Sequence, residues 1–154
     1  MKFGVHIDDK ALSRQITKAM KVAPREAAKA MMDCVLDLAG ESARRAPIES
    51  GDLRNNCHGE VQGATVFLNQ QASPTAVAPT PRLEGVVGYS LPYALRQHED
   101  LTLPHDRTDG YRRADGTTVN MVAGGEAKYL EKPFEERKPR YIDRFAKIVE
   151  ESIK

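Results

Sequence analysis

The segment APIESGDLR, residues 46–54, decides how this chain folds, because it ends the longest helical pattern in the sequence. An alanine-rich stretch from Pro24 to Arg45 runs directly into it. Pro47 disfavours helical backbone at Ala46 and has no amide hydrogen to donate. The sequence therefore predicts a helix over Pro24 to Arg45 that serves as the main packing helix of the fold.

A structural turn is predicted directly after that helix. A serine hydroxyl such as that of Ser50 can accept a hydrogen bond from a following amide, and Gly51 tolerates a positive φ angle. Leu53 is the only large apolar residue after these two, so we expect it to anchor the turn in the core. The side chain of Arg54 is expected to point away from the core. Together with Pro47, these residues form the predicted hinge of the protein.

The flanking segments predict the remaining elements. Residues 3–7 alternate between apolar and polar side chains, as in a half-buried strand, and a helix with Leu12, Ile16, Ala19 and Met20 on one face follows. Val61 to Asn69 and Leu83 to Tyr89 indicate two strands, with Ala64, Val66 and Leu68 on one face of the first. The uncharged residues 70–81 are predicted to form the tip of the hairpin between them.

The last helix is predicted to start at Pro139, and a minor strand is expected at 117–122. The predicted class is α+β: a single domain over residues 1–154, with an antiparallel sheet of about four strands. The long helix and the C-terminal helix pack on one face of that sheet. Residues 70–82 and 99–125 are predicted to be mobile loops, and loops of this length are often functional.

Composition excludes several classes of protein. The 154 residues include 23 Lys and Arg against 22 Asp and Glu, a formal net charge of +1, so the chain lacks the strongly basic character of a dedicated nucleic-acid binder. No apolar run is long enough to span a bilayer, and no signal peptide is expected. Cys34 and Cys57 lack metal-site or redox spacing, and Cys34 is predicted to be a buried, inert thiol.

Two histidine–acid pairs, His98-Glu99 and His105-Asp106, are the only cluster typical of metal or acid–base chemistry. The histidines are seven residues apart with Pro104 between them, unlike the His-Glu-x-x-His arrangement of a helical zinc site. A solvated polar loop is favoured over a metal-dependent hydrolase or nuclease. No catalytic, cofactor-binding or metal-binding residue is predicted, and the chain is not expected to be an enzyme.

Tyr89 and Tyr93 flank a strand-to-helix corner, and their position predicts ordinary packing at the sheet edge. Arg112 and Arg113 form the densest basic spot. They could contact phosphates, but because acidic residues interrupt this spot, a mixed-charge surface is favoured. Arg112 and Arg113 are also candidate subunit contacts.

Three stretches resemble one protein family when taken in order. The family's Ala-Pro-Ile-x-Ser-Gly-x-Leu-Arg motif is matched at residues 46–54, its strand-to-helix corner at 86–94 (VVGYSLPYA), and its C-terminal end at Lys132-Pro133-Phe134. The chain is similar in this way to small tail-completion and head–tail joining (neck) proteins of long-tailed bacteriophages. It departs from them after Ala94, where the family usually has a Glu-Phe-Gly-Thr-like segment and this chain has His98-Glu99-Asp100.

The resemblance implies a structural virion protein at the phage head–tail junction, assembled in the cytoplasm of the bacterial host. It implies a homo-oligomeric ring, hexameric by family analogy, whose partners are the head connector or adaptor and the tail tube or terminator protein. In the family the corner at 86–94 lies close to where neighbouring subunits meet, so the resemblance also makes Tyr89 and Tyr93 candidates for subunit contacts. DNA would only pass through the ring, and neither a membrane nor a cofactor is implied. A minor capsid protein of the same virion is the alternative.

Overall fold

The computed structural model describes residues 3–6, 10–47, 52–75, 83–101, 111–112, 118–119 and 125–153. Its main sheet is antiparallel and contains, in spatial order, β1 (Phe3–His6), β5 (Gly85–Tyr89), β2 (His58–Val61), β3 (Ala64–Leu68) and β4 (Gln71–Ala72). The helices are α1 (Lys10–Val22), α2 (Pro24–Arg45), α3 (Asp52–Asn56), α4 (Ala94–Glu99) and α5 (Glu131–Ser152). A separate pair is formed by β6 (Tyr111–Arg112) and β7 (Thr118–Val119). The predicted α+β class is confirmed, with the two-residue β4 added to four longer strands.

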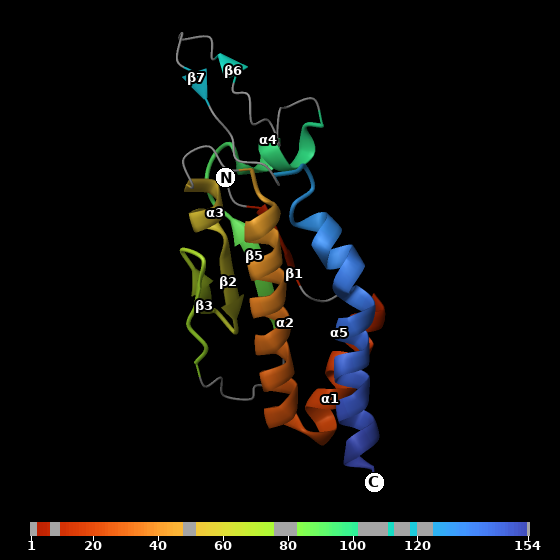
Figure 1. Cartoon of the computed structure of the whole chain (residues 1–154). Helices are drawn as coiled ribbons and strands as arrows, with labels where there is room; N and C mark the ends of the chain where they lie inside the picture. Colours follow the sequence, from red (N-terminus) through yellow and green to blue (C-terminus); the bar gives the residue numbers. More distant parts are fainter. Residues whose placement is uncertain are drawn as a thin grey trace.

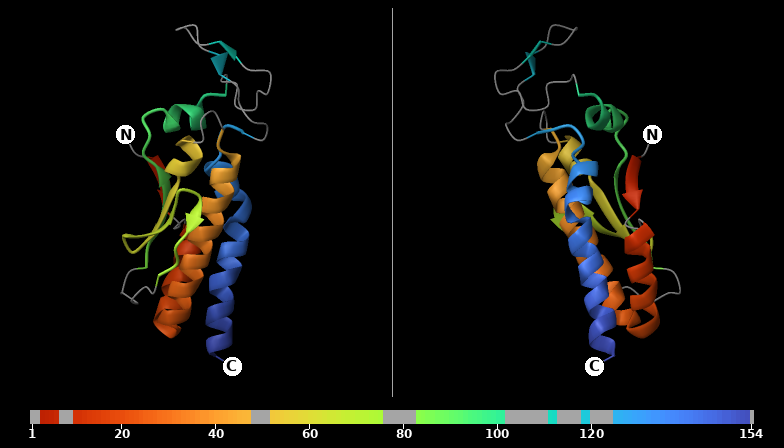
Figure 2. Two further views of the ribbon diagram at one scale, coloured as in Figure 1. Left: turned by 60° about the vertical axis from the view of Figure 1, so that its left-hand side comes forward. Right: turned by 90° about the vertical axis from the view of Figure 1, so that its right-hand side faces the viewer.

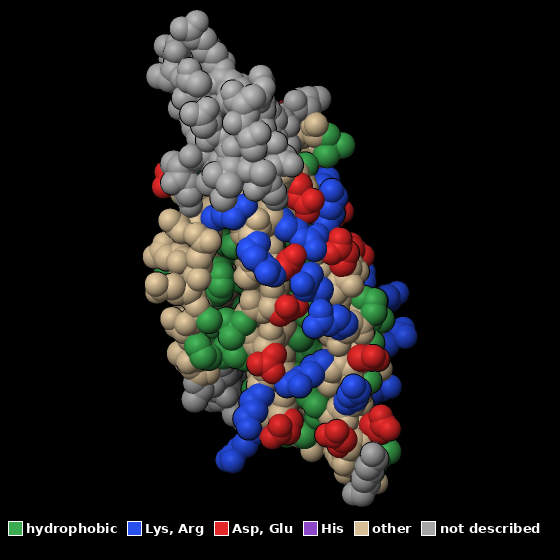
Figure 3. Space-filling model, in the orientation of Figure 1, with side chains coloured by type: hydrophobic (Ala, Val, Ile, Leu, Met, Phe, Trp, Pro, Cys, Tyr) green, Lys and Arg blue, Asp and Glu red, His purple; other side chains and the backbone are tan. Residues whose placement is uncertain are grey.

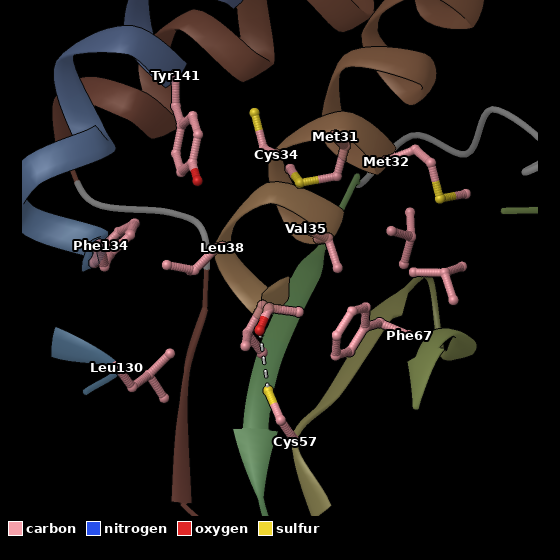
Figure 4. Close-up of a cluster of buried hydrophobic side chains, with 14 of the residues drawn as sticks. Met31, Met32, Cys34, Val35, Leu38, Cys57, Phe67, Leu130, Phe134 and Tyr141 are labelled. Atoms are coloured by element: carbon pink, nitrogen blue, oxygen red, sulfur yellow. Dashed lines mark hydrogen bonds between the residues drawn. The ribbon is translucent and has the colours of Figure 1, made fainter. Parts of the chain in front are cut away.

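Helix α2 has the bounds that the sequence predicts, and it lies across β2, β3 and β5 (Figure 1). Glycines in the strands let it approach closely. A Cβ atom at Gly85 would lie 2.6 Å from Met31 Sδ, and one at Gly59 would lie 2.8 Å from Val35 Cγ1. Met31 and Val35 point from α2 toward the strands (Figure 4). The small residues on both surfaces therefore set the spacing between the helix and the sheet.

Helices α1 and α5 pack against each other and against α2, on the side of the sheet that α2 covers (Figure 2). The predicted start of the last helix is wrong: α5 begins at Glu131, and Pro139 lies inside it. A proline in a helix removes one amide donor. Buried Phe134 lies before Pro139 and buried Tyr141 and Phe145 lie after it, so the same apolar stripe holds both halves of the helix.

The strand predicted at 61–69 is confirmed as β3, but it begins at Ala64, because Val61 ends β2 and a hairpin turn joins the two strands. Gln62 and Gly63 have φ angles of 54° and 79°, which is the geometry of a tight turn between β2 and β3. The register shifts opposite Gly59 and Glu60, so the adjacent residues Val66 and Phe67 are both buried. Leu68 is consequently 45% exposed, and the predicted Ala64, Val66 and Leu68 face does not form.

The two predicted strands, β3 and β5, do not pair with each other, so the predicted hairpin with its tip at 70–81 does not form; residues 76–82 lie outside the described part of the chain. Gln71–Ala72 form β4 beside β3, whereas β5 pairs with β1 and β2. Of the predicted minor strand at 117–122, Thr118 and Val119 form β7, which pairs with β6.

Candidate assembly surface

The predicted hinge is a connection between α2, α3 and the core. Leu53 is 4% exposed and anchors α3 in the core, as predicted. Pro47 is also buried. The prediction for Arg54 is wrong, because its guanidinium turns back and Nε donates to the carbonyl oxygen of Ala46 at 2.8 Å. Ala46 is the C-cap of α2, where carbonyls lack intrahelical partners and a cation is favourable. Ser50 and Gly51 lie outside the described residues.

Asn56, at the end of α3, is a structural residue that sequence reasoning missed. Its Oδ1 accepts hydrogen bonds from the amides of Ser90 at 2.6 Å and Leu91 at 3.0 Å, and its Nδ2 donates to Ser90 Oγ. These bonds tie α3 to the corner that follows β5. Asn is a common turn residue, but nothing in its local sequence indicates a partner 34 positions away.

Tyr89 is not available for subunit contacts, which corrects that prediction. Its side chain is fully buried at the end of β5, and its hydroxyl lies 2.8 Å from Ser42 Oγ in α2. Its ring packs edge-on against Tyr129, with ring centroids 5.1 Å apart. Burial raises the pKa of Tyr89 well above its usual value. Tyr93, by contrast, is 44% exposed and remains a candidate contact residue.

His98 is a buried structural residue rather than part of a solvated loop. It is 4% exposed, its Nε2 lies 3.2 Å from the amide of Glu131, and its Nδ1 lies 2.8 Å from Glu99 Oε1. An imidazole that accepts at Nε2 carries its proton on Nδ1, so the neutral ring donates to Glu99 and caps the start of α5. Burial lowers the pKa of His98, which favours this neutral form.

Of the two histidine–acid pairs, only His98-Glu99 lies in the described part of the chain. Glu99 binds His98 and Lys128, while His105 and Asp106 lie outside the described part of the chain. No group of three or more His, Cys, Asp or Glu side chains suited to a metal ion occurs in the part that is described.

Both cysteines are free and buried, so the prediction of a buried Cys34 is confirmed (Figure 4). Burial raises the pKa of each thiol to about 12. Cys57 Sγ also lies 3.5 Å from the carbonyl oxygen of Ala39. The thiolate is the reactive form of cysteine, so thiols with such a raised pKa are inert at neutral pH.

The structure brings most of the predicted site residues to one end of the body. The end of α2, α3, α4 and the start of α5 meet there, and β6 and β7 lie beyond α4 (Figures 1 and 2). Two apolar side chains bracket α4 and are exposed: Tyr93 at 44% and Leu101 at 74%. We call Tyr93, Leu101 and the β6–β7 pair the assembly end. Arg112 belongs to β6, whereas Arg113 lies outside the described residues.

No family model matches the chain, and no curated protein or solved structure matches it. None of the helices described here has the length and apolar character needed to cross a bilayer.

Proposed function

We propose that this protein is a structural subunit of the head–tail junction of a long-tailed bacteriophage. It forms a homo-oligomeric ring that completes the tail or joins it to the head connector. The phage assignment comes from the motif resemblance at residues 46–54, 86–94 and 132–134. The observation that supports an assembly role is the exposure of two large apolar side chains, Tyr93 and Leu101, on either side of α4.

The roles of the reactive side chains support an assembly function over catalysis. His98 caps α5 and packs on Tyr129, with ring centroids 5.0 Å apart. The hydroxyl of Tyr129 in turn donates to the carbonyl oxygen of Ala94 at 2.6 Å. Arg54 holds the end of α2. His98 and Tyr129 fix the orientation of α4 relative to the start of α5, which positions Tyr93 and Leu101.

The oligomeric state tests this proposal. Size-exclusion chromatography with light scattering and negative-stain imaging should show closed rings, with six subunits by family analogy. A double variant, Tyr93→Asp with Leu101→Asp, should be monomeric with an unchanged circular dichroism spectrum, because charge at an apolar contact disfavours its burial. The control changes Val22→Asp and Ile153→Asp, since these residues are 47% and 79% exposed at the opposite end of the helices.

Rings that persist in the assembly-end variant but not in the control would contradict the proposed surface. A wild-type protein that stays monomeric even with purified phage tails and DNA-filled heads would contradict the proposed function. Labelling of intact virions separates this role from that of a minor capsid protein, since the label should appear at the neck and not across the head.

A further inference from the structure

Helix α1 differs from the rest of the chain in its charge. Its thirteen residues include Lys10, Arg14, Lys18 and Lys21, and no acidic residue. The whole chain has a formal net charge of +1 from 23 basic and 22 acidic residues, so the part outside α1 is net acidic. The near-neutral total therefore conceals one concentrated basic element.

The four cations form a single line along α1. Spacings of four, four and three residues place them within about 80° of the helix circumference and along about 16 Å of its length. All four are exposed. We call Lys10, Arg14, Lys18 and Lys21 the basic stripe.

The opposite side of α1 holds this stripe rigidly against the body. Leu12 and Ala19 are fully buried and Ile16 is 6% exposed, and α1 packs on both α5 and α2. The right-hand view of Figure 2 shows α1 beside α5.

None of the four cations forms an ion pair with any residue that the structure describes. The cations of α2 and α5 differ: Lys29 pairs with Glu26, Lys132 with Glu126, and Arg144 with Asp33. Like charges four residues apart on a helix are destabilising. The stripe therefore costs stability, and no acidic residue in the described part of the chain pairs with it to offset this cost.

We propose that the basic stripe binds the phosphate backbone of duplex DNA without reading its sequence. A line of cations at a spacing of about 6 Å, on a rigid helix, meets the requirement for backbone contacts, which come chiefly from Lys and Arg. Side chains that read bases would need to enter a groove as part of a projecting element, whereas α1 is seated against α5.

Two other polyanionic partners fit the stripe less well. A helix that binds a lipid surface inserts its apolar face, and the apolar face of α1 is buried in the protein. A protein interface is typically centred on aromatic or other large apolar side chains, and lysine is depleted in such interfaces. The stripe has three lysines and one arginine, and only Val22 at its end is an exposed large apolar residue of α1. This inference rests on α1 alone and does not depend on ring formation.

Fluorescence anisotropy with the full-length protein and a 30-base-pair duplex of random sequence tests the proposal. Four phosphate contacts predict a slope of about −3.6 for log K against log salt, which is about a 150-fold loss of affinity between 50 and 200 mM salt. The triple variant Arg14→Gln, Lys18→Gln, Lys21→Gln should reduce the slope to about −0.9 and weaken binding at least tenfold at 50 mM salt.

The matched control removes three exposed charges that have acidic partners: Lys29→Gln, Arg44→Gln and Lys132→Gln. It should retain the wild-type slope, and both triple variants should keep the wild-type circular dichroism spectrum. Undetectable binding by the wild type at 50 mM salt, or equal losses in the two triple variants, would overturn the proposal. Competition by polyglutamate at equal charge concentration, or equal binding to anionic lipid vesicles, would overturn it in favour of another polyanion.

Discussion

The seam between α2 and α5 and the basic stripe on α1 use the same residue types in opposite ways. In the seam, acids of α2 face cations of α5: Asp33 binds Arg144 at 2.7 Å and Asp37 binds Arg137 at 2.9 Å. Arg45 of α2 binds Glu136 of α5 with both terminal nitrogens, at 2.7 and 3.2 Å. Red and blue side chains accordingly alternate over these two helices in Figure 3. Both regions place charges at helical spacing, but only in the seam does the neighbouring helix supply the opposite charge.

This comparison shows that the partner helix, rather than the number of charges, decides what a charged face does. Within the seam, the contribution of each pair also varies with burial. The side chain of Arg137 is 17% exposed and that of Asp37 is 35% exposed, whereas the Arg144 and Asp33 side chains are both more than half exposed. Exposed pairs are worth little, and partly buried pairs with several hydrogen bonds are worth more.

The largest effect is expected from Asp37→Ala in the seam. Asp37 Oδ2 accepts from Arg137 Nε and, at 2.7 Å, from the hydroxyl of buried Tyr141. Its removal leaves both donors without this acceptor, and we expect the free energy of unfolding to fall by about 1–3 kcal/mol. Urea denaturation at pH 7 measures the change. Asp33→Ala is the control and should lower the free energy of unfolding by less than about 1 kcal/mol. Equal losses in the two variants would show that burial does not distinguish the pairs.

The sequence predicts the parts of this fold that depend on local pattern. The bounds of α2 follow from Pro24 and Pro47, and the burial of Leu53 follows from its being the only large apolar residue after the turn. The predicted face of Ala64, Val66 and Leu68 does not form, because a bulge puts Val66 and Phe67 on the buried side together and breaks the alternation.

The candidate site is less accessible from sequence, because its contacts join distant residues. Arg54 turns inward to a carbonyl eight positions earlier, and His98 finds the amide of Glu131 at a separation of 33 positions. Likewise, the seam joins residues about a hundred positions apart. The basic stripe could have been found from the spacing of Lys10, Arg14, Lys18 and Lys21. Only the fold shows that no acid among the residues it describes pairs with them.

His98 sharpens the comparison, because it is an ionisable side chain that the fold keeps uncharged. Its Nε2 accepts from the start of α5, next to Glu99, Lys128 and Glu131, and burial lowers its pKa below the usual 6.5. Stability is therefore complete above pH 6.5 and falls as pH decreases toward the folded-state pKa, because the unfolded chain is protonated first. We therefore expect the free energy of unfolding to decrease between pH 7.5 and 5.

Urea denaturation at several pH values measures this loss, and His98→Gln provides the comparison, because it cannot titrate. The difference in stability between wild type and His98→Gln should shrink as pH falls from 7.5 to 5. A constant difference would show that folding does not lower the pKa of His98, and a growing difference would show that the folded protein favours the charged imidazole.

The smallest effect, and the most discriminating, is expected from single charge removals. Arg14 has a like charge four residues away on each side, Lys10 and Lys18, so Arg14→Gln should raise the free energy of unfolding by about 0.5 kcal/mol. Lys29→Gln removes a cation that pairs with Glu26 and should lower it by a similar or smaller amount. Thermal unfolding at 20 mM and 500 mM salt measures both, and high salt should reduce both differences because it screens exposed charges. A loss of stability in Arg14→Gln would mean that the fold itself uses this cation, and the basic stripe would then be one more structural surface like the seam.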